Sequence, residues 1–141
     1  MEPLDPASFA EGSVLFLDSA PIIYVLEGHR RFARRFMPLF ERHATGAVRF
    51  AVSTITIAEV LTGPLRANDE VLAKRYRAIF DSWHVVDLTA DIAESAARLR
   101  TAAGLRLPDA VQVASALAVG ADALVTHDRD FSKVRALPIF G

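Results

Sequence analysis

Short runs of consecutive apolar residues, separated by segments with helical periodicity, are the feature that most restricts how this chain folds. The runs occupy residues 14–17, 50–53, 85–86 and 123–126, and residues 138–140 are a candidate edge strand. Because the apolar residues are continuous rather than alternating, each strand needs cover on both faces, as the strands of a parallel sheet do. We therefore expect an α/β fold, a three-layer α/β/α domain around a central, mainly parallel sheet.

The segments between these runs predict helices whose ends carry recognisable signals. We expect helices from Ser19 to about Glu27, from about His29 to Ala44, from Thr54 or Thr56 to about Leu61, from a cap at Asn68 or Asp69, from a cap at Thr89 to Gly104, and from Pro108 to Val119. Gly63 and Pro64 predict a break after the third helix. In the fourth, an inward stripe is expected from Val71, Leu72, Tyr76, Ile79, Phe80 and Trp83.

The composition fits one domain and excludes several kinds of site. At 141 residues the chain has the length of a single domain, with an expected loose lead-in over residues 1–13 and the domain over 14–141. It has no cysteine, which excludes disulfides, thiolate nucleophiles and cysteine-bound zinc. The N-terminal residues lack the pattern of a signal peptide and no apolar stretch is long enough to cross a bilayer, so we expect a cytoplasmic protein without membrane contact.

Four acidic residues stand where an apolar strand or helix face gives way to a polar edge: Asp18, Glu59, Asp109 and Asp128. The first directly follows a strand, the second lies just past the next strand, the third opens a helix and the last follows the fourth strand. Sites in such sheets form beyond the carboxyl ends of the strands, so these side chains are expected to converge. Converging carboxylates repel one another unless a cation lies between them, and oxygen ligands without thiolates favour Mg²⁺ or Mn²⁺ over zinc.

Each acid also has a purely structural explanation. Asp18 suits an N-cap, Asp109 is favoured by the helix dipole after Pro108, and Asp128 suits a cap of the turn that follows it. Glu59 is harder to explain in this way because its neighbours in sequence are apolar, although a structural ion pair would account for it. These alternatives stay open for each residue taken singly, while the shared position of all four favours a common site.

The acids lie in four segments that occur in this order: LFLDSAPIIYVLE, STITIAEVLTG, LRLPDAVQVASAL and ALVTHDRDF. Together they resemble the motifs of the PIN-domain ribonucleases, especially the VapC-type toxins of bacterial toxin–antitoxin pairs, over about residues 14–140. The resemblance implies a PIN-like domain whose catalytic acids and metal ligands are Asp18, Glu59, Asp109 and Asp128, with Asp130 as a further ligand. Ala20 and Pro21 stand where Asn or Ser often follows in the toxins, a departure that touches none of the acids.

This resemblance implies hydrolysis of RNA phosphodiesters to 5′-phosphate products, with Mg²⁺ or Mn²⁺ as the cofactor. Such an ion lowers the pKa of a bound water and offsets charge on the phosphate. The resemblance further implies an RNA substrate, a cognate antitoxin protein and a homodimer. Two rival classes are a PIN-like interaction module that has lost activity, which a missing acid would reveal, and an aspartyl-phosphate phosphotransfer domain, which needs a second Asp after the first strand or a lysine at a later strand end.

Other polar residues are expected to support the site. The groups expected at its edge are Ser19, Thr54, Gln112 and Thr126. Because the net charge is −1, RNA would have to be held by a local patch, and the candidates on the outer face of the second helix are Arg30, Arg31, Arg34 and Arg35. A solvated helix face is the alternative for these arginines. His127 is expected to orient a neighbour or to be exposed, rather than to act in catalysis.

Overall fold

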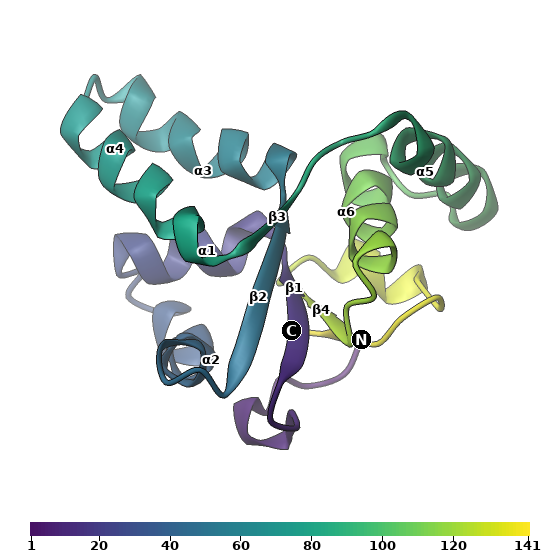
Figure 1. Cartoon of the computed structure of the whole chain (residues 1–141), viewed down its shortest axis with the longest axis horizontal. Helices are drawn as coiled ribbons and strands as arrows, with labels where there is room; N and C mark the ends of the chain where they lie inside the picture. Colours follow the sequence, from purple (N-terminus) through teal and green to yellow (C-terminus); the bar gives the residue numbers. More distant parts are fainter.

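The computed structural model describes residues 1–141 and contains one five-stranded sheet with helices on both faces (Figure 1). The strands are β1 (Ser13–Leu17), β2 (Val48–Ser53), β3 (His84–Val86), β4 (Ala123–Val125) and β5 (Ile139–Phe140). They lie in the order β3-β2-β1-β4-β5, and every neighbouring pair is parallel. The predicted three-layer α/β/α architecture is confirmed, and the sheet is parallel throughout.

Six helices cover the sheet: α1 (Ser19–Glu27), α2 (Ala33–Ala44), α3 (Thr54–Arg66), α4 (Glu70–Ile79), α5 (Ala90–Ala103) and α6 (Leu107–Ala118). Figure 1 shows α1 to α4 on one side of the sheet and α5 with α6 on the other. The chain also contains short 3₁₀ segments at Pro6–Ser8, Phe80–Ser82 and Arg129–Lys133. None of the helices combines the length and the apolar character needed to span a membrane.

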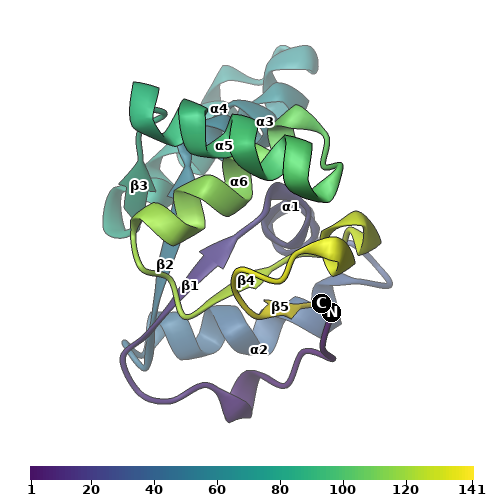
Figure 2. The ribbon, with the colours of Figure 1, turned by 90° about the vertical axis from the view of Figure 1, so that its right-hand side faces the viewer.

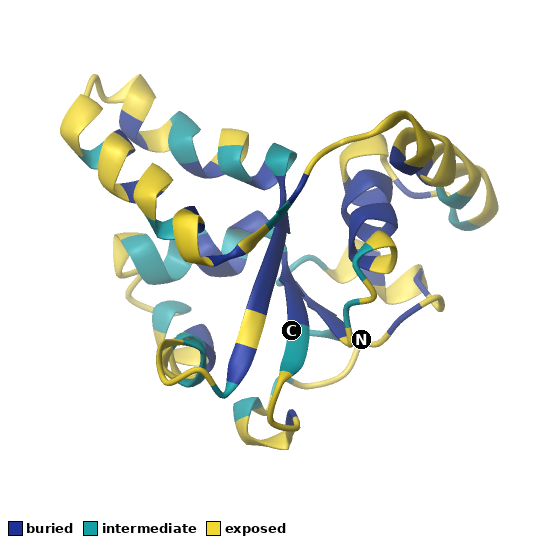
Figure 3. Ribbon diagram, in the orientation of Figure 1, coloured by how far each residue is buried: buried dark blue, intermediate teal, exposed yellow.

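Each face of the sheet has its own apolar core, which explains the uninterrupted apolar strands. On β1, Phe16 packs on the side of α5 and α6, whereas Leu15 and Leu17 pack on the side of α1 to α4. All three are completely buried, and Figure 3 shows β1 and β2 dark over most of their length. Because successive side chains of a strand point to opposite faces, only a sheet that is covered on both sides buries them all.

The N-terminal segment is not the loose lead-in that we expected. The Glu2 N–H donates to the Ile139 carbonyl at 2.8 Å and the Gly141 N–H donates to the Glu2 carbonyl at 3.0 Å, so residue 2 lies alongside β5. The Phe9 ring packs edge-on against Phe140, with the ring centroids 5.0 Å apart. Figure 2 shows the two chain ends next to each other beside β5. The first residues therefore belong to the folded domain.

The predicted break of the third helix is wrong. α3 does not stop at Gly63 and Pro64 but continues to Arg66. Pro64 has no N–H to donate to the carbonyl of Val60, but it is buried close to the end of the helix, so only one internal hydrogen bond is lost there. Burial of the proline outweighs that local defect, and the helix runs on.

The predicted start of the second helix is also wrong. α2 begins at Ala33 rather than at about His29, and Phe32 occupies its N-cap position. The His29 imidazole accepts the N–H groups of Arg31 and Phe32, both at 3.2 Å. These bonds hold a turn between α1 and α2, so Arg30 and Arg31 precede the helix instead of lying on its face.

The inward stripe predicted for α4 is right except at its first position. Leu72, Tyr76, Ile79, Phe80 and Trp83 all join the core on that side of the sheet. Val71 is 65% exposed, because the buried side of the helix is set by Ala73, two residues or about 200° of helical turn away.

Gly63 and Gly104 offer a matched test of the helical geometry. A Cβ on Gly63, inside α3, would meet nothing closer than Glu27 Oε1 at 3.6 Å, so Gly63→Ala should raise the free energy of unfolding by about 0.5–1 kcal/mol. Gly104 ends α5 with a φ of 66°, where alanine is disfavoured, so Gly104→Ala should lower it by about 1 kcal/mol. Urea denaturation measures both. If α3 broke at Gly63, Gly63→Ala would not stabilise the chain.

Candidate active site

A pocket of about 410 Å³ lies at the carboxyl edge of the sheet. Its lining contains four acids from four separate parts of the chain: Asp18 after β1, Glu59 in α3, Asp109 in α6 and Asp128 after β4. The remaining lining residues are Ser19, Ala20, Arg106, Pro108 and Gln112. The structure therefore brings together the four acids that the sequence placed at one edge, and β1, which lies between β2 and β4, puts the first of them between the others.

Asp18 is held by three hydrogen bonds from uncharged donors. Its Oδ1 accepts the Ser19 N–H at 2.9 Å and the Gln112 Nε2 at 3.0 Å, and its Oδ2 accepts the Thr126 hydroxyl at 2.9 Å. Asp18 is also the N-cap of α1, so the capping interpretation is right, and the same carboxylate lines the acid pocket. The carboxylate is fixed in orientation, and none of these partners neutralises its charge.

Gln112 connects the strand ends beneath the pocket. It is 2% exposed, and besides Asp18 its Nε2 donates to the Thr56 hydroxyl at 2.8 Å. Its Oε1 accepts the Ser53 hydroxyl in a short hydrogen bond. One side chain of α6 thus contacts the end of β2, the first turn of α3 and the residue after β1.

Ser53 and Thr56 fill the role that the sequence analysis gave to Thr54. Thr54 opens α3 and makes no side-chain hydrogen bond to the site, whereas Ser53 caps α3 by accepting the Thr56 N–H at 3.3 Å. The signal that would have found Ser53 is its position, because a serine between an apolar strand and a helical segment is a favoured helix N-cap, and Thr56 lies in the first turn that it caps.

Thr126 and Asp128 fix the other side of the pocket. The Thr126 hydroxyl donates to Asp18 and accepts the Asp128 N–H at 3.0 Å. Asp128 Oδ1 accepts the Asp130 N–H at 2.9 Å, so Asp128 caps the following 3₁₀ segment, as its structural interpretation expected. Asp130 is exposed and does not line the pocket, but one oxygen from each of Asp109, Asp128 and Asp130 lies within 4.8 Å of the other two.

Asp109 is the most enclosed of the acids. It is 8% exposed, and its Oδ2 is buried without a hydrogen-bond partner. Burial raises the pKa of this carboxyl, the Arg106 guanidinium opposes the rise, and Asp128 and Asp18 add to it. A buried oxygen without a partner is costly for a folded chain, so this corner of the pocket is short of positive charge.

Glu59 lies at the rim and remains accessible to solvent. Partial burial raises the pKa of its carboxyl and the charge of Asp18 adds to the rise, while the Ser19 side chain opposes it and Asp109 adds a further increase. No basic side chain forms an ion pair with Glu59, so the structural alternative for this residue gains no support. The acids instead act on one another.

One basic side chain, which the sequence analysis missed, reaches the acids. Arg106 Nε lies 3.6 Å from Asp109 Oδ2, and its terminal NH2 nitrogen lies 3.9 Å from Asp128 Oδ2. Its position three residues before Asp109, at the start of α6, is the signal that points to the pair.

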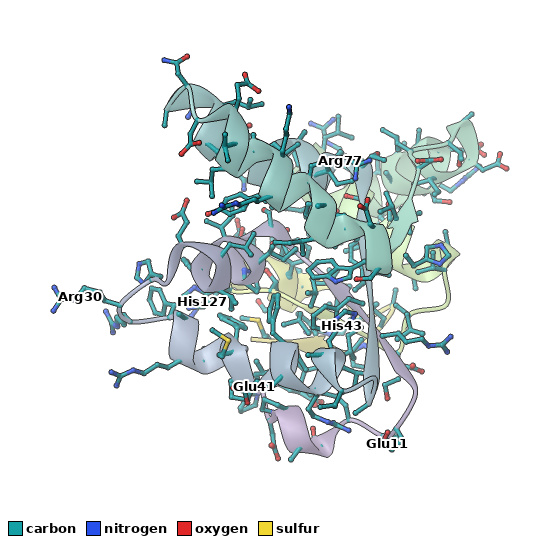
Figure 4. All side chains as sticks on the ribbon, turned by 60° about the vertical axis from the view of Figure 1, so that its left-hand side comes forward. Glu11, Arg30, Glu41, His43, Arg77 and His127 are labelled. Carbon is teal, nitrogen blue, oxygen red and sulfur yellow. The ribbon has the colours of Figure 1, made fainter.

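His127 faces away from the acid pocket. Its Nδ1 lies 3.0 Å from the Tyr24 hydroxyl, and its ring lies 4.3 Å from that of Phe32. Figure 4 shows it near the turn that carries Arg30. The pKa of His127 is lowered by burial and by the positive charges of Arg35, Arg129 and Arg31. A neutral, positioning imidazole agrees with this environment.

The four arginines proposed for RNA binding do not form one helix face, and of them only Arg31 and Arg35 act on the pKa of His127. Arg30 and Arg31 lie in the turn before α2, and Figure 4 shows Arg30 extending outward from it. Arg34 is exposed in the first turn of α2, and the Arg35 guanidinium donates to the Gly141 carbonyl. Arg129, which the sequence analysis did not single out, lines a second pocket of about 420 Å³ together with Arg35 and His127. We call these five arginines the arginine cluster.

The family model of the PIN domain matches residues 15–137 of the chain. Among solved structures, a toxin–antitoxin complex from Klebsiella pneumoniae is 27% identical, with a TM-score of 0.69 over 89% of this chain and 95% of that one. VapBC2 from Rickettsia felis, bound to promoter DNA, is 20% identical, with a TM-score of 0.72 over 89% and 96%. VapC20 from Mycobacterium tuberculosis, a sarcin-ricin loop cleaving toxin, is 21% identical, with a TM-score of 0.66 over 86% and 98%. No curated protein matches the chain.

Asp109→Asn tests the repulsion within the pocket. Because the pKa of Asp109 is raised, the folded chain holds a proton on this carboxyl more tightly than the unfolded chain does. The free energy of unfolding therefore falls as pH rises through the folded-state pKa of Asp109. Removing the charge should therefore raise the free energy of unfolding at pH 7 and flatten its decline with pH, as measured by urea denaturation in EDTA. The exposed control Asp87→Asn should change it by less than about 0.5 kcal/mol. A loss of stability in Asp109→Asn would mean that Arg106 already compensates the charge.

Proposed function

This chain belongs to the PIN domain family, and we propose that it is a metal-dependent ribonuclease that hydrolyses RNA phosphodiesters, the VapC-type toxin of a type II toxin–antitoxin pair acting in the cytoplasm. The observation that carries the proposal is the pocket in which Asp18, Glu59, Asp109 and Asp128 meet. Four carboxylates from distant segments, two of them with pKa values raised by burial and by their neighbours, repel one another, and a bound cation would relieve that repulsion.

The donor set of the pocket fits a hard divalent cation, Mg²⁺ or Mn²⁺. All the charged side chains of the pocket that can bind a metal ion are carboxylates. One oxygen of Asp109, Oδ2, is buried without a hydrogen-bond partner. The residues that would hold the ion are Asp18, Glu59, Asp109 and Asp128, with Asp130 at the rim. When bound, such an ion neutralises the acids, activates a water and offsets charge on the phosphate.

The side chains around the acids prepare the site before any ligand arrives. Gln112 and Thr126 fix both oxygens of Asp18, so that its carboxylate need not reorient on binding. Glu59 is the acid at the open rim, and its raised pKa suits it to accept the proton of an attacking water on a carboxylate oxygen.

The arginine cluster is the surface that we propose binds the RNA backbone. It adjoins the acid pocket through His127 and Asp128, which are neighbours in sequence, and three of its members, Arg31, Arg35 and Arg129, lie close enough to His127 to lower its pKa. A chain with a net charge of −1 has no general attraction for a polyanion, so a local group of arginines is the means by which it would hold one.

A cognate antitoxin and a second copy of the chain are the proposed protein partners. The antitoxin is supported by the likeness to the Klebsiella pneumoniae toxin–antitoxin complex, which extends over 89% of this chain. Apolar side chains are available for an interface at the adjoining ends of α3 and α4, where Leu65 and Val71 are 45% and 65% exposed.

The two rival functions receive less support. An inactive interaction module would be expected to have lost an acid, and all four line the pocket. A phosphotransfer domain needs a lysine beside the acid that follows a strand, but Lys133 Nζ instead donates to the Gly104 carbonyl at 3.2 Å.

Asp18→Asn tests the ribonuclease proposal directly. The change removes a charge at nearly constant size, and the Thr126 hydroxyl can turn to accept from the new amide, so the fold should persist. We expect cleavage of single-stranded RNA in Mn²⁺ to fall by at least about 100-fold, because a proposed metal ligand is lost.

The matched control is Asp91→Asn, an exposed acid in the first turn of α5, which should cleave like the parent. Circular dichroism of each variant checks the fold. Undiminished cleavage by the parent in excess EDTA would contradict the metal mechanism.

Replacing both Arg30 and Arg34 with Ala tests the arginine cluster. If each contacts one phosphate, the slope of log affinity against log salt for single-stranded RNA should flatten by about 0.7 per contact, while the rate at saturating RNA stays close to that of the parent. Fluorescence anisotropy over a salt series measures the slope. Replacing Arg98 and Arg100 of α5 with Ala is the control of equal charge. An unchanged slope in the Arg30 and Arg34 variant would identify these arginines as a solvated surface.

A further inference from the structure

Arg106 is the only basic side chain in the lining of the acid pocket. It occupies the N-cap position of α6 without making a side-chain capping bond, and its side chain is 72% exposed. Its guanidinium nitrogens approach Asp109 and Asp128 at 3.6 Å and 3.9 Å, which is ion-pair distance but beyond a good hydrogen bond. The side chain is therefore held at the mouth of the pocket by charge alone.

We propose that Arg106 is a resident counter-ion that a divalent cation displaces from Asp109 and Asp128, and that its released guanidinium then binds a phosphate of the RNA substrate. This inference rests on the proposed function and adds a residue to it. It assigns one side chain two successive partners, first Asp109 and Asp128 and then the backbone of the substrate.

The displacement follows from the geometry of the ion pairs. Asp109 Oδ2 remains without a hydrogen-bond partner even with Arg106 beside it, so the guanidinium does not satisfy the buried oxygen. A compact ion with two charges can contact that oxygen directly, whereas the contacts that Arg106 would give up are long and open to solvent. The exchange replaces the single, weakly held positive charge of Arg106 with the two positive charges of the metal ion.

The second step follows from where the displaced side chain can go. The backbone of Arg106 is fixed at the start of α6, so the guanidinium stays within a side-chain length of the pocket. A guanidinium presents paired N–H donors that match the oxygens of a phosphate, which an ammonium group does not. Arg106 thus becomes available to RNA at the place where the phosphate to be cleaved would lie, and only after the metal has bound.

These two roles predict effects of opposite sign for one substitution. Arg106→Gln removes the competing charge, so the metal-free protein should bind Mn²⁺ roughly two- to fivefold more tightly, the range expected for a partly exposed ion pair. The same variant should lose about tenfold or more in kcat/KM for RNA at saturating Mn²⁺, because a charge-assisted contact to the phosphate is gone. A purely structural role would weaken both.

The experiment compares the parent with Arg106→Gln, Arg106→Lys and the control Arg98→Gln, whose arginine pairs with Glu94 on α5. Titration calorimetry of the full-length, metal-free proteins with Mn²⁺ gives the metal affinity, and cleavage of a single-stranded RNA at saturating Mn²⁺ gives kcat and KM. Arg106→Lys should keep the metal affinity of the parent, because it keeps the charge, and should recover only part of the cleavage. Arg98→Gln should match the parent in both.

Each result decides one part of the inference. Equal or weaker Mn²⁺ binding by Arg106→Gln overturns the counter-ion, and cleavage at the parental rate overturns the phosphate contact. If the parent binds Mn²⁺ but cleaves no RNA, the proposed function fails and the phosphate contact fails with it, while the metal titration still decides the counter-ion. If the parent binds no Mn²⁺, both roles fail together with the proposed metal site.

Discussion

The buried amide of Gln112 is the contact on which the geometry of the acids depends. From α6 it donates to Asp18 and Thr56 and accepts from Ser53, so a single side chain ties together segments that are far apart in the sequence. Leaving any of these buried groups unpaired would cost about 1–3 kcal/mol, so α6 and the strand ends stay in register with one another. The acids repel one another, and this neutral network keeps them in place without cancelling their charge.

Much of the fold was readable in the sequence because its signals are local. Continuous apolar runs require a sheet that is covered twice, and in such a sheet the residues that follow β1, β2 and β4 must share an edge. The convergence of Asp18 and Asp128 follows from that rule. Which of Thr54 and Thr56 contacts the site does not follow from it. Side chains two residues apart on a helix point about 200° away from each other, so the answer depends on where the helix begins. Periodicity alone does not locate a helix start to that accuracy.

The features that escaped prediction depend on partners distant in sequence or on packing. The pairing of Glu2 with Ile139 has no local pattern, and α3 continues through Pro64 because the proline is buried and lies close to the helix end, where few internal hydrogen bonds depend on it. The arginines were expected on a helix face, but the His29 ring closes a turn that excludes Arg30 and Arg31 from α2. In each case a single long-range or side-chain contact decided the outcome.

The pairing of β4 with β5 has a consequence for how the protein is made. The Thr126 N–H donates to the Phe140 carbonyl at 2.9 Å, and the hydroxyl of the same threonine holds Asp18. Translation releases residue 18 long before residue 140, and parallel sheets with distant partners form slowly because their long loops must close first. The hydrogen bonds of Thr126 therefore reach their final geometry, with the Thr126 hydroxyl on Asp18, only once β5 has been synthesised and has paired with β4.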